Sequence, residues 1–248
     1  MQGRFSRIVV PSVSLALLLL APASVAATSR LPDLGIARLA DIRIDRTPDG
    51  RKLLRYTTVI VNVGAGPFEV RGSRASTSES MAVSQRIYDD GGDYQDVSTS
   101  AQMFFAGDGH SHWHVRDLES AELIRLDYGV KVGTWGKHGF CFWDNTKYRL
   151  SLPGAPSSSV YTNCGNSSSA LAVTMGLSIG WGDTYPASLP DQYIDVTGLT
   201  AGRYKLVVTA DEQNWFAETN KTNNAAWVVI QLKGNGNSVR VVEYGPEP

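Results

Sequence analysis

The pattern that most constrains this chain is a succession of short β-branched and aromatic runs separated by Gly, Asn, Asp and Pro. Runs of this length with turn residues between them are typical of strands rather than helices. The pattern predicts an all-β fold, an antiparallel β-sandwich-like single domain or partly open barrel with long loops. The expected strands cover residues 37–45, 52–63, 67–71, 83–88, 110–115, 120–127, 139–143, 193–196, 203–210, 225–232 and 239–244.

Three segments depart from the strand pattern. Residues 169–177 are the one stretch after the N-terminal region for which a helix is an alternative. Residues 73–81 are rich in Ser and Thr, and residues 153–169 are rich in Pro, Ser, Asn and Gly, so both are predicted to be surface loops. No internal repeat or change in composition marks a boundary, and we expect one domain over residues 28–248.

The first 27 residues predict a secretory signal peptide. Arg4 and Arg7 precede an apolar run at residues 13–20, and small residues follow as far as Ala27. That run is far shorter than the about 20 residues that cross a bilayer, so we expect no membrane span after the signal is removed. The expected location is therefore secreted, extracellular or in the cell envelope.

Charge and cysteine content narrow the function classes. The 248 residues contain 23 Lys and Arg against 24 Asp and Glu, with no basic block, which argues against nucleic acid and anionic lipid as partners. The hydrophobic content of 42% with 19% charged residues argues against disorder. In an oxidising compartment the two cysteines, Cys141 and Cys164, are expected to form a disulfide bond.

Three of the four histidines fall within five residues, as His110, His112 and His114. On a helix this spacing fans the rings around the axis, whereas on a strand all three point to one face and Trp113 points to the core. A set of imidazole ligands suits copper(II) or zinc, and copper binds more strongly. Three protein ligands leave positions open for water or substrate, which is typical of a catalytic metal site. The alternative is a run of surface histidines without a metal.

The residues around this cluster resemble the lysyl oxidase catalytic domain. No single motif is specific, but the whole set occurs in one order over roughly residues 34–232. The motifs are VNVG at 61–64, the histidine cluster, KHGFCFWD at 137–144, GLSIGWGDTY at 176–185, QYIDVT at 192–197, GRY at 202–204, Glu218, and the pair Asn223 and Asn224.

The resemblance implies a copper amine oxidase. The family's copper ligands correspond to His110, His112 and His114, and its lysine tyrosylquinone cofactor corresponds to Lys137 and Tyr185. The implied reaction converts a primary amine, either protein lysine or a small amine, to an aldehyde with O2. The resemblance favours peptidyl lysine, while an exported setting makes a small amine equally plausible.

For other polar residues the sequence leaves more than one role open. Asp183 is the candidate catalytic base, with His138 as the second candidate, and the alternative for Asp183 is a side chain that forms a turn. Lys147 competes with Lys137 for the cofactor role, and only the motif favours Lys137. Asp144 is expected to be a structural hydrogen-bond partner, and so is Asp195 of the QYIDVT motif.

Three tryptophans are further candidates for the site. Trp135, Trp143 and Trp181 could line an amine pocket, but burial alone is an alternative for each.

Animal members of the family carry many cysteines in this domain, against two here, and a histidine where this chain has Ala121. These differences affect the expected proton transfer rather than the metal site or the cofactor pair.

Two other functions compete with the amine oxidase. One is an extracellular copper-binding β module in which Tyr185 stays a tyrosine. The other is a cell-envelope adhesion or glycan-binding sandwich in which the histidines are incidental. The sequence also leaves copper and zinc open as the metal in the cell.

Overall fold

The computed structural model describes residues 27–106, 111–135, 137 and 139–248. The predicted signal peptide lies almost wholly outside these residues, as do His110 and His138. The described part of the chain forms β-strands and loops, and it contains no helix that could cross a membrane. All strand pairs are antiparallel. The all-β, antiparallel fold in a single domain is therefore confirmed.

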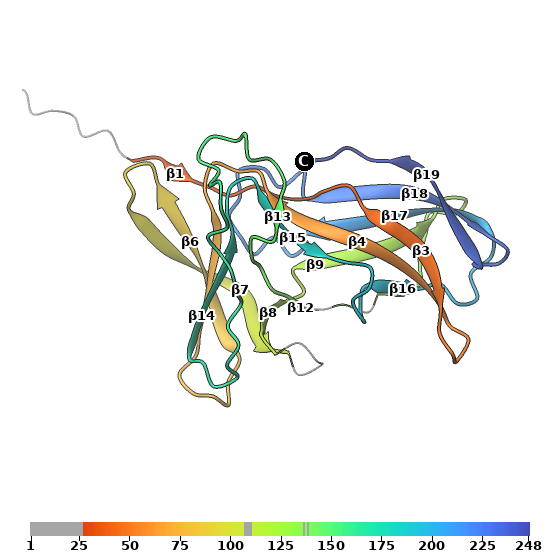
Figure 1. Ribbon diagram of the computed structural model, residues 1–248, viewed down its shortest axis with the longest axis horizontal. Helices are drawn as coiled ribbons and strands as arrows, with labels where there is room; N and C mark the ends of the chain where they lie inside the picture. Colours follow the sequence, from red (N-terminus) through yellow and green to blue (C-terminus); the bar gives the residue numbers. More distant parts are fainter. Residues whose placement is uncertain (1–26, 107–110, 136, 138) are drawn as a thin grey trace, which may run out of the picture.

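The strands form three sheets (Figure 1). The first sheet has the order β12 (Gly139–Phe140), β8 (Trp113–Arg116), β7 (Tyr94–Phe105), β6 (Met81–Asp89), β5 (Phe68–Ser73) and β14 (Ala172–Leu177), with β1 (Ser29–Arg30) beside β6. The second sheet has the order β10 (Val130–Val132), β9 (Glu119–Arg125), β17 (Gly202–Ala210), β18 (Ala225–Lys233) and β19 (Ser238–Tyr244). The third, here called the β4 sheet, has the order β11 (Thr134–Trp135), β16 (Tyr193–Asp195), β4 (Lys52–Asn62), β15 (Trp181–Tyr185) and β13 (Thr146–Lys147), with β2 (Leu34–Ile36) and β3 (Ala40–Arg46) also beside β4.

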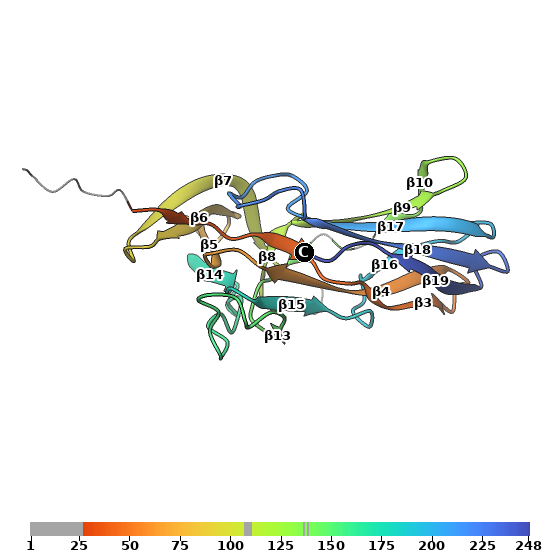
Figure 2. The same cartoon turned by 90° about the horizontal axis from the view of Figure 1, so that it is seen from above.

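The second sheet and the β4 sheet pack face to face. Figure 2 shows β17 and β18 lying over β4 and β3, while the first sheet stands at one end of the molecule. Alternating side chains of β17 are buried, so its apolar face turns toward β4 and its other face toward solvent. The prediction of a sandwich-like arrangement therefore describes this half of the molecule.

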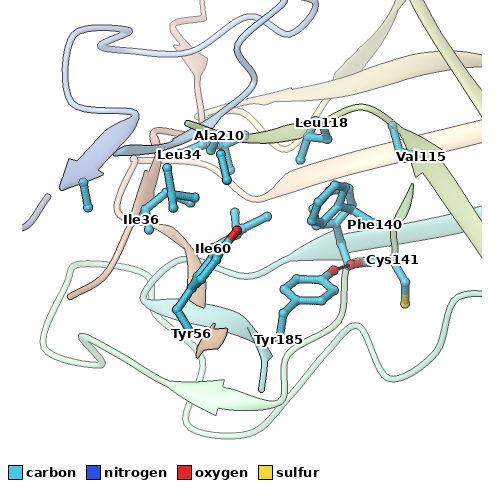
Figure 3. Packing of buried hydrophobic residues seen from close by; sticks show 14 of the residues in the cluster. Leu34, Ile36, Tyr56, Ile60, Val115, Leu118, Phe140, Cys141, Tyr185 and Ala210 are labelled. Atoms are coloured by element: carbon cyan, nitrogen blue, oxygen red, sulfur yellow. Dashed lines mark hydrogen bonds between the residues drawn. The ribbon is translucent and has the colours of Figure 1, made fainter. Parts of the chain in front are cut away.

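One hydrophobic core joins the three sheets. Phe68 of β5 packs edge-on against Phe142 and Phe216, with ring centroids 5.4 and 5.0 Å apart. Figure 3 shows how Tyr185 of β15 and Phe140 of β12 continue this core, with their rings close together. Their centroids are 5.3 Å apart, so the core extends to the place where the first sheet meets the β4 sheet.

Several strand predictions are confirmed, while the strand predicted at residues 139–143 is shorter, since β12 covers Gly139–Phe140 only. Residues 52–63, 203–210 and 225–232 form β4, β17 and β18 almost as expected. The possible helix at residues 169–177 is wrong, because β14 occupies Ala172–Leu177 and pairs with β5. The two predicted surface loops are confirmed apart from the ends of the first: residues 74–80 and 153–169 contain no strand, while Ser73 ends β5 and Met81 begins β6.

Several strands were not predicted, among them β7 and β15. The strand β7 is polar on most positions and pairs with β6 on one side and β8 on the other. The strand β15 carries Asp183 and Tyr185 and pairs with β4, with Tyr185 opposite Thr58. The expected strand over residues 110–115 is also shorter, since β8 begins at Trp113 and His112 lies in the bend before it.

Candidate active site

Two of the predicted metal ligands meet where the chain enters β8. The backbone N–H of Trp113 donates to the carbonyls of Cys164 and Gly165, which fixes the start of this strand. The Trp113 ring is 1% exposed and packs in the core, as predicted. His112 and His114, on the opposite side of the chain, have their Nε2 atoms 2.9 Å apart.

The His114 ring is held by its neighbours in the first sheet. Phe104 of β7 meets it edge-on, with centroids 5.7 Å apart. Gly139 of β12 lies against it so closely that an added Cβ would stand 2.5 Å from Nδ1. The glycine of the KHGF sequence is therefore needed to leave room for this imidazole.

The spacing of the two imidazoles fits a shared metal ion. Neutral imidazole nitrogens are donors that copper and zinc take, and with their Nε2 atoms 2.9 Å apart both rings could bind one ion. No group of three or more potential ligands is assembled within the described residues, which do not include His110. The donor chemistry thus fits a nitrogen-ligated metal, and the ligand roles of all three histidines stay predictions.

Lys137 and Tyr185 lie together beside this pair. Lys137 is 6% exposed, and its Nζ is 4.9 Å from the Tyr185 ring centroid and 5.1 Å from that of Phe140. The amine and the phenol ring are therefore neighbours in the folded chain. By contrast, Lys147 of β13 is exposed and its Nζ lies 5.9 Å from the Trp181 ring.

Asp183 is hydrogen-bonded to Tyr185 on the same strand. The Tyr185 hydroxyl lies 2.8 Å from Asp183 Oδ2 and also within hydrogen-bonding distance of the Cys141 carbonyl, a contact drawn in Figure 3. A phenol has one proton and a carbonyl can only accept, so both contacts are satisfied together when Asp183 carries a proton. The Asn145 side chain donates to Asp183 Oδ1. These bonds exclude the turn-forming role considered for Asp183.

The protonation of this pair follows from burial. Desolvation raises the pKa of Asp183 to about 8, although the bonds from Tyr185 and Asn145 lower it. Desolvation also raises the pKa of Tyr185 well above its usual value, and the neighbouring Asp183 raises it further. In the metal-free protein at neutral pH, both oxygens therefore hold their protons.

A cavity of about 340 Å³ opens onto these groups. His112, His114, Lys137, Asp183 and Tyr185 all line it. Its remaining wall comes from the segment before β13, from the predicted loop at residues 153–169, and from Thr184 and the segment that follows β15. The described site residues expected from the sequence therefore face one cavity, although they come from two sheets and the loop before β12.

The disulfide bond between Cys141 and Cys164 fixes one side of this cavity. Their Cα atoms are 5.8 Å apart, which confirms the predicted pairing. Both cysteines line the cavity, and the bond joins the loop at residues 153–169 to the segment that follows β12. Asp144 strengthens the same connection, because its carboxylate accepts the N–H groups of Val160, Tyr161 and Ser178.

The expected structural roles of two aspartates are therefore confirmed. Asp144 is a hydrogen-bond partner as described, and Asp195 Oδ1 accepts the N–H of Thr197 at the end of β16. Among the tryptophans, Trp181 is 4% exposed and its indole N–H donates to Pro156, so burial explains it. Trp143 is 40% exposed and lines the cavity.

Glu119 was missed by the sequence analysis. It begins β9 in the second sheet, is fully buried, and accepts a hydrogen bond of 3.4 Å from Thr58 on Oε1. No described residue donates to its Oε2. Burial raises the pKa of Glu119 to about 8, against an opposing effect of Lys137. A single glutamate in a strand of alternating polarity looks like a solvent-facing residue, so only the packing of the two sheets reveals it.

Comparisons with known proteins agree with this geometry. Residues 72–243, more than half of the chain, match the family model described as Lysyl oxidase. The chain belongs to the lysyl oxidase family. The resemblance inferred from the sequence motifs is thereby confirmed.

The lysyl oxidase relatives are distant and much longer. Lysyl oxidase homolog 1 of Homo sapiens is 30% identical over 128 residues, which is 50% of this chain and 20% of that protein. Lysyl oxidase homolog 3 of Homo sapiens is 25% identical over 175 residues, or 71% of this chain and 18% of that protein. Lysyl oxidase homolog 3A of Danio rerio is 26% identical over 176 residues, with the same coverage. The matched part of this chain spans about a fifth of the length of these relatives.

Proposed function

We propose that this protein is a copper-dependent amine oxidase of the lysyl oxidase type. Its substrates are primary amines, either protein lysine or small amines, which it converts to aldehydes with O2. The cofactor is lysine tyrosylquinone, made from Lys137 and Tyr185, and the metal is Cu(2+) held by His110, His112 and His114. The observation that carries the proposal is the buried Lys137 nitrogen 4.9 Å from the Tyr185 ring centroid, in the cavity that two imidazoles also line.

Each described residue has a role in this proposal. His112 and His114 supply neutral nitrogen donors at a spacing that one ion can bridge. Copper supplies one-electron and dioxygen chemistry at the phenol, and the quinone supplies the carbonyl that condenses with an amine. Lys137 is nearly buried, and its amine lies beside the Tyr185 ring, where it could add as a nucleophile.

Asp183 is the proton carrier of the proposal. Its Oδ2 lies 2.8 Å from the Tyr185 oxygen, so its ionised form is placed to accept the phenol proton. It also lines the cavity, where it can act as the base toward a bound substrate. His138, the second candidate base, lies outside the described residues.

Export belongs to the proposal as well. We infer that residues 1–27 act as a secretory signal and that the catalytic domain of residues 28–248 works outside the cytoplasm. The Cys141–Cys164 disulfide supports this, because disulfides persist in oxidising compartments. A copper-binding module without amine oxidation would need the histidines alone, and it would leave the Lys137–Tyr185 arrangement without a role.

The test is oxidation of amines by protein assembled with copper in air. We expect peroxide release and O2 consumption with primary amines and none with a tertiary amine. Tyr185→Phe and Lys137→Met should abolish the activity, while Lys147→Met should keep it. Copper-loaded protein that releases no peroxide with any primary amine would contradict the proposal.

A further inference from the structure

Trp143 sits in a segment whose backbone is held at several points. Its own carbonyl accepts the N–H of Asn145, and two residues earlier the Cys141 carbonyl accepts the Tyr185 hydroxyl. On the other side, the Asn145 amide donates to Asp183 and its carbonyl oxygen accepts the N–H of Thr184. The position of the tryptophan relative to the reacting groups is therefore fixed by the site itself.

The ring nevertheless points out of the core. Neighbouring Phe142 is fully buried against Phe68, and Asp144 is 4% exposed. The side chain between them is turned outward, and Trp143 is 40% exposed where it lines the cavity. A large aromatic ring on a rigid backbone forms a preorganised apolar wall, which costs little entropy when a ligand binds.

The rest of the cavity favours an uncharged ligand body. Pro186 and Leu189 add apolar surface, and Thr162, Asn163 and Asn166 add neutral polar groups. Among the described lining residues Asp183 is the one carboxylic acid, and both of its oxygens are engaged by Tyr185 and Asn145. A second ammonium group entering this cavity would lose its water without gaining, from these residues, a carboxylate oxygen that is free of other partners.

We propose that Trp143 is the specificity-determining residue of this cavity, and that its substrates are small primary monoamines with an apolar body, above all arylalkyl amines. This inference rests on the proposed amine oxidase function. The cavity of about 340 Å³ lies at the lower end of the usual size of small-molecule sites. An aromatic substrate gains from ring–ring contact with the indole in addition to burial of its area.

The kinetic test compares amines on the copper-loaded protein. We expect kcat/KM for 2-phenylethylamine to exceed that for 1,5-diaminopentane and for a lysine-containing peptide by about tenfold or more. Trp143→Ala should raise KM for 2-phenylethylamine about tenfold with little change in kcat, which corresponds to the loss of a ring contact and its buried area. Trp143→Phe keeps an aromatic ring at this position, and its KM for 2-phenylethylamine should be close to that of the wild-type protein. Tyr128→Ala, which removes a ring that is 74% exposed and does not line the cavity, is the matched control and should change neither constant.

A binding measurement separates this inference from the proposed function. N,N-dimethyl-2-phenylethylamine, a tertiary amine, should bind the copper-free protein with a calorimetric Kd that Trp143→Ala weakens about tenfold. If no amine releases peroxide but this binding effect is seen, the proposed function fails and the assignment of Trp143 stands. Equal binding by the wild-type protein and Trp143→Ala, or equal turnover of 1,5-diaminopentane and 2-phenylethylamine, would overturn the inference.

Discussion

A covalent bond between Lys137 and Tyr185 should raise the free energy of unfolding. The disulfide bond sets the size of this gain, because it shortens the loop that the new bond closes. The shortest covalent path between the two residues runs from Lys137 to Cys141, across to Cys164 and on to Tyr185. This path contains about 25 residues, about half of the direct separation, and closing it removes chain entropy worth about 3.5 kcal/mol. For a domain of this size that gain raises the Tm by about 7–14 °C.

The assay compares two preparations of the same chain. One is loaded with copper in air and then stripped with a chelator, so that metal binding does not add to its stability. The other is kept copper-free under argon. Thermal and urea unfolding should show the higher stability only in the first, and Tyr185→Phe treated in the same two ways should show no difference. Cross-linked protein with an unchanged Tm, or an equal rise in Tyr185→Phe, would refute the reasoning.

Three further predictions concern the buried groups of the site. Because burial raises the pKa of Asp183 and of Glu119 to about 8, the folded copper-free protein binds protons more tightly than the unfolded chain between about pH 4 and pH 8. Its free energy of unfolding should therefore fall as pH rises through this range, and the double variant of Asp183→Asn and Glu119→Gln should flatten the profile measured by urea titration. Replacing Cys141 and Cys164 by alanine should lower the free energy of unfolding by about 3 kcal/mol in the same assay. An unchanged urea midpoint would contradict the stabilising role of the disulfide. Asn145→Ala removes the amide that donates to Asp183 Oδ1, and it should lower the free energy of unfolding by about 1–3 kcal/mol. It should also lower the yield of cross-linked protein. Full yield and unchanged stability would contradict the positioning role of Asn145.

The regular strands could be predicted from the sequence because one of their faces is buried. In β17 alternate residues are apolar, and the register against β9 and β18 follows from that alternation. The polar strand β7 gives no such signal, since most of its side chains are exposed and only its backbone pairing defines it. The suggested helix at residues 169–177 was wrong because short apolar runs carry little periodicity, and pairing with β5 decides the structure.

The candidate site was predictable where residue spacing limits the chemistry. His112 and His114 are two residues apart, so their rings can meet even though only His114 lies in a strand. The role of Glu119 could not be read in the same way, because it faces Thr58 only when the second sheet covers the β4 sheet. The exposure of Trp143 likewise depends on bonds made by its neighbours to residues far along the chain.

The most direct test of the central claim is a peptide map of protein purified with copper in air. The account predicts a cross-linked fragment that contains both Lys137 and Tyr185, and its absence from protein prepared without copper. Copper-loaded protein that yields these two residues only in separate, unmodified peptides would contradict the account.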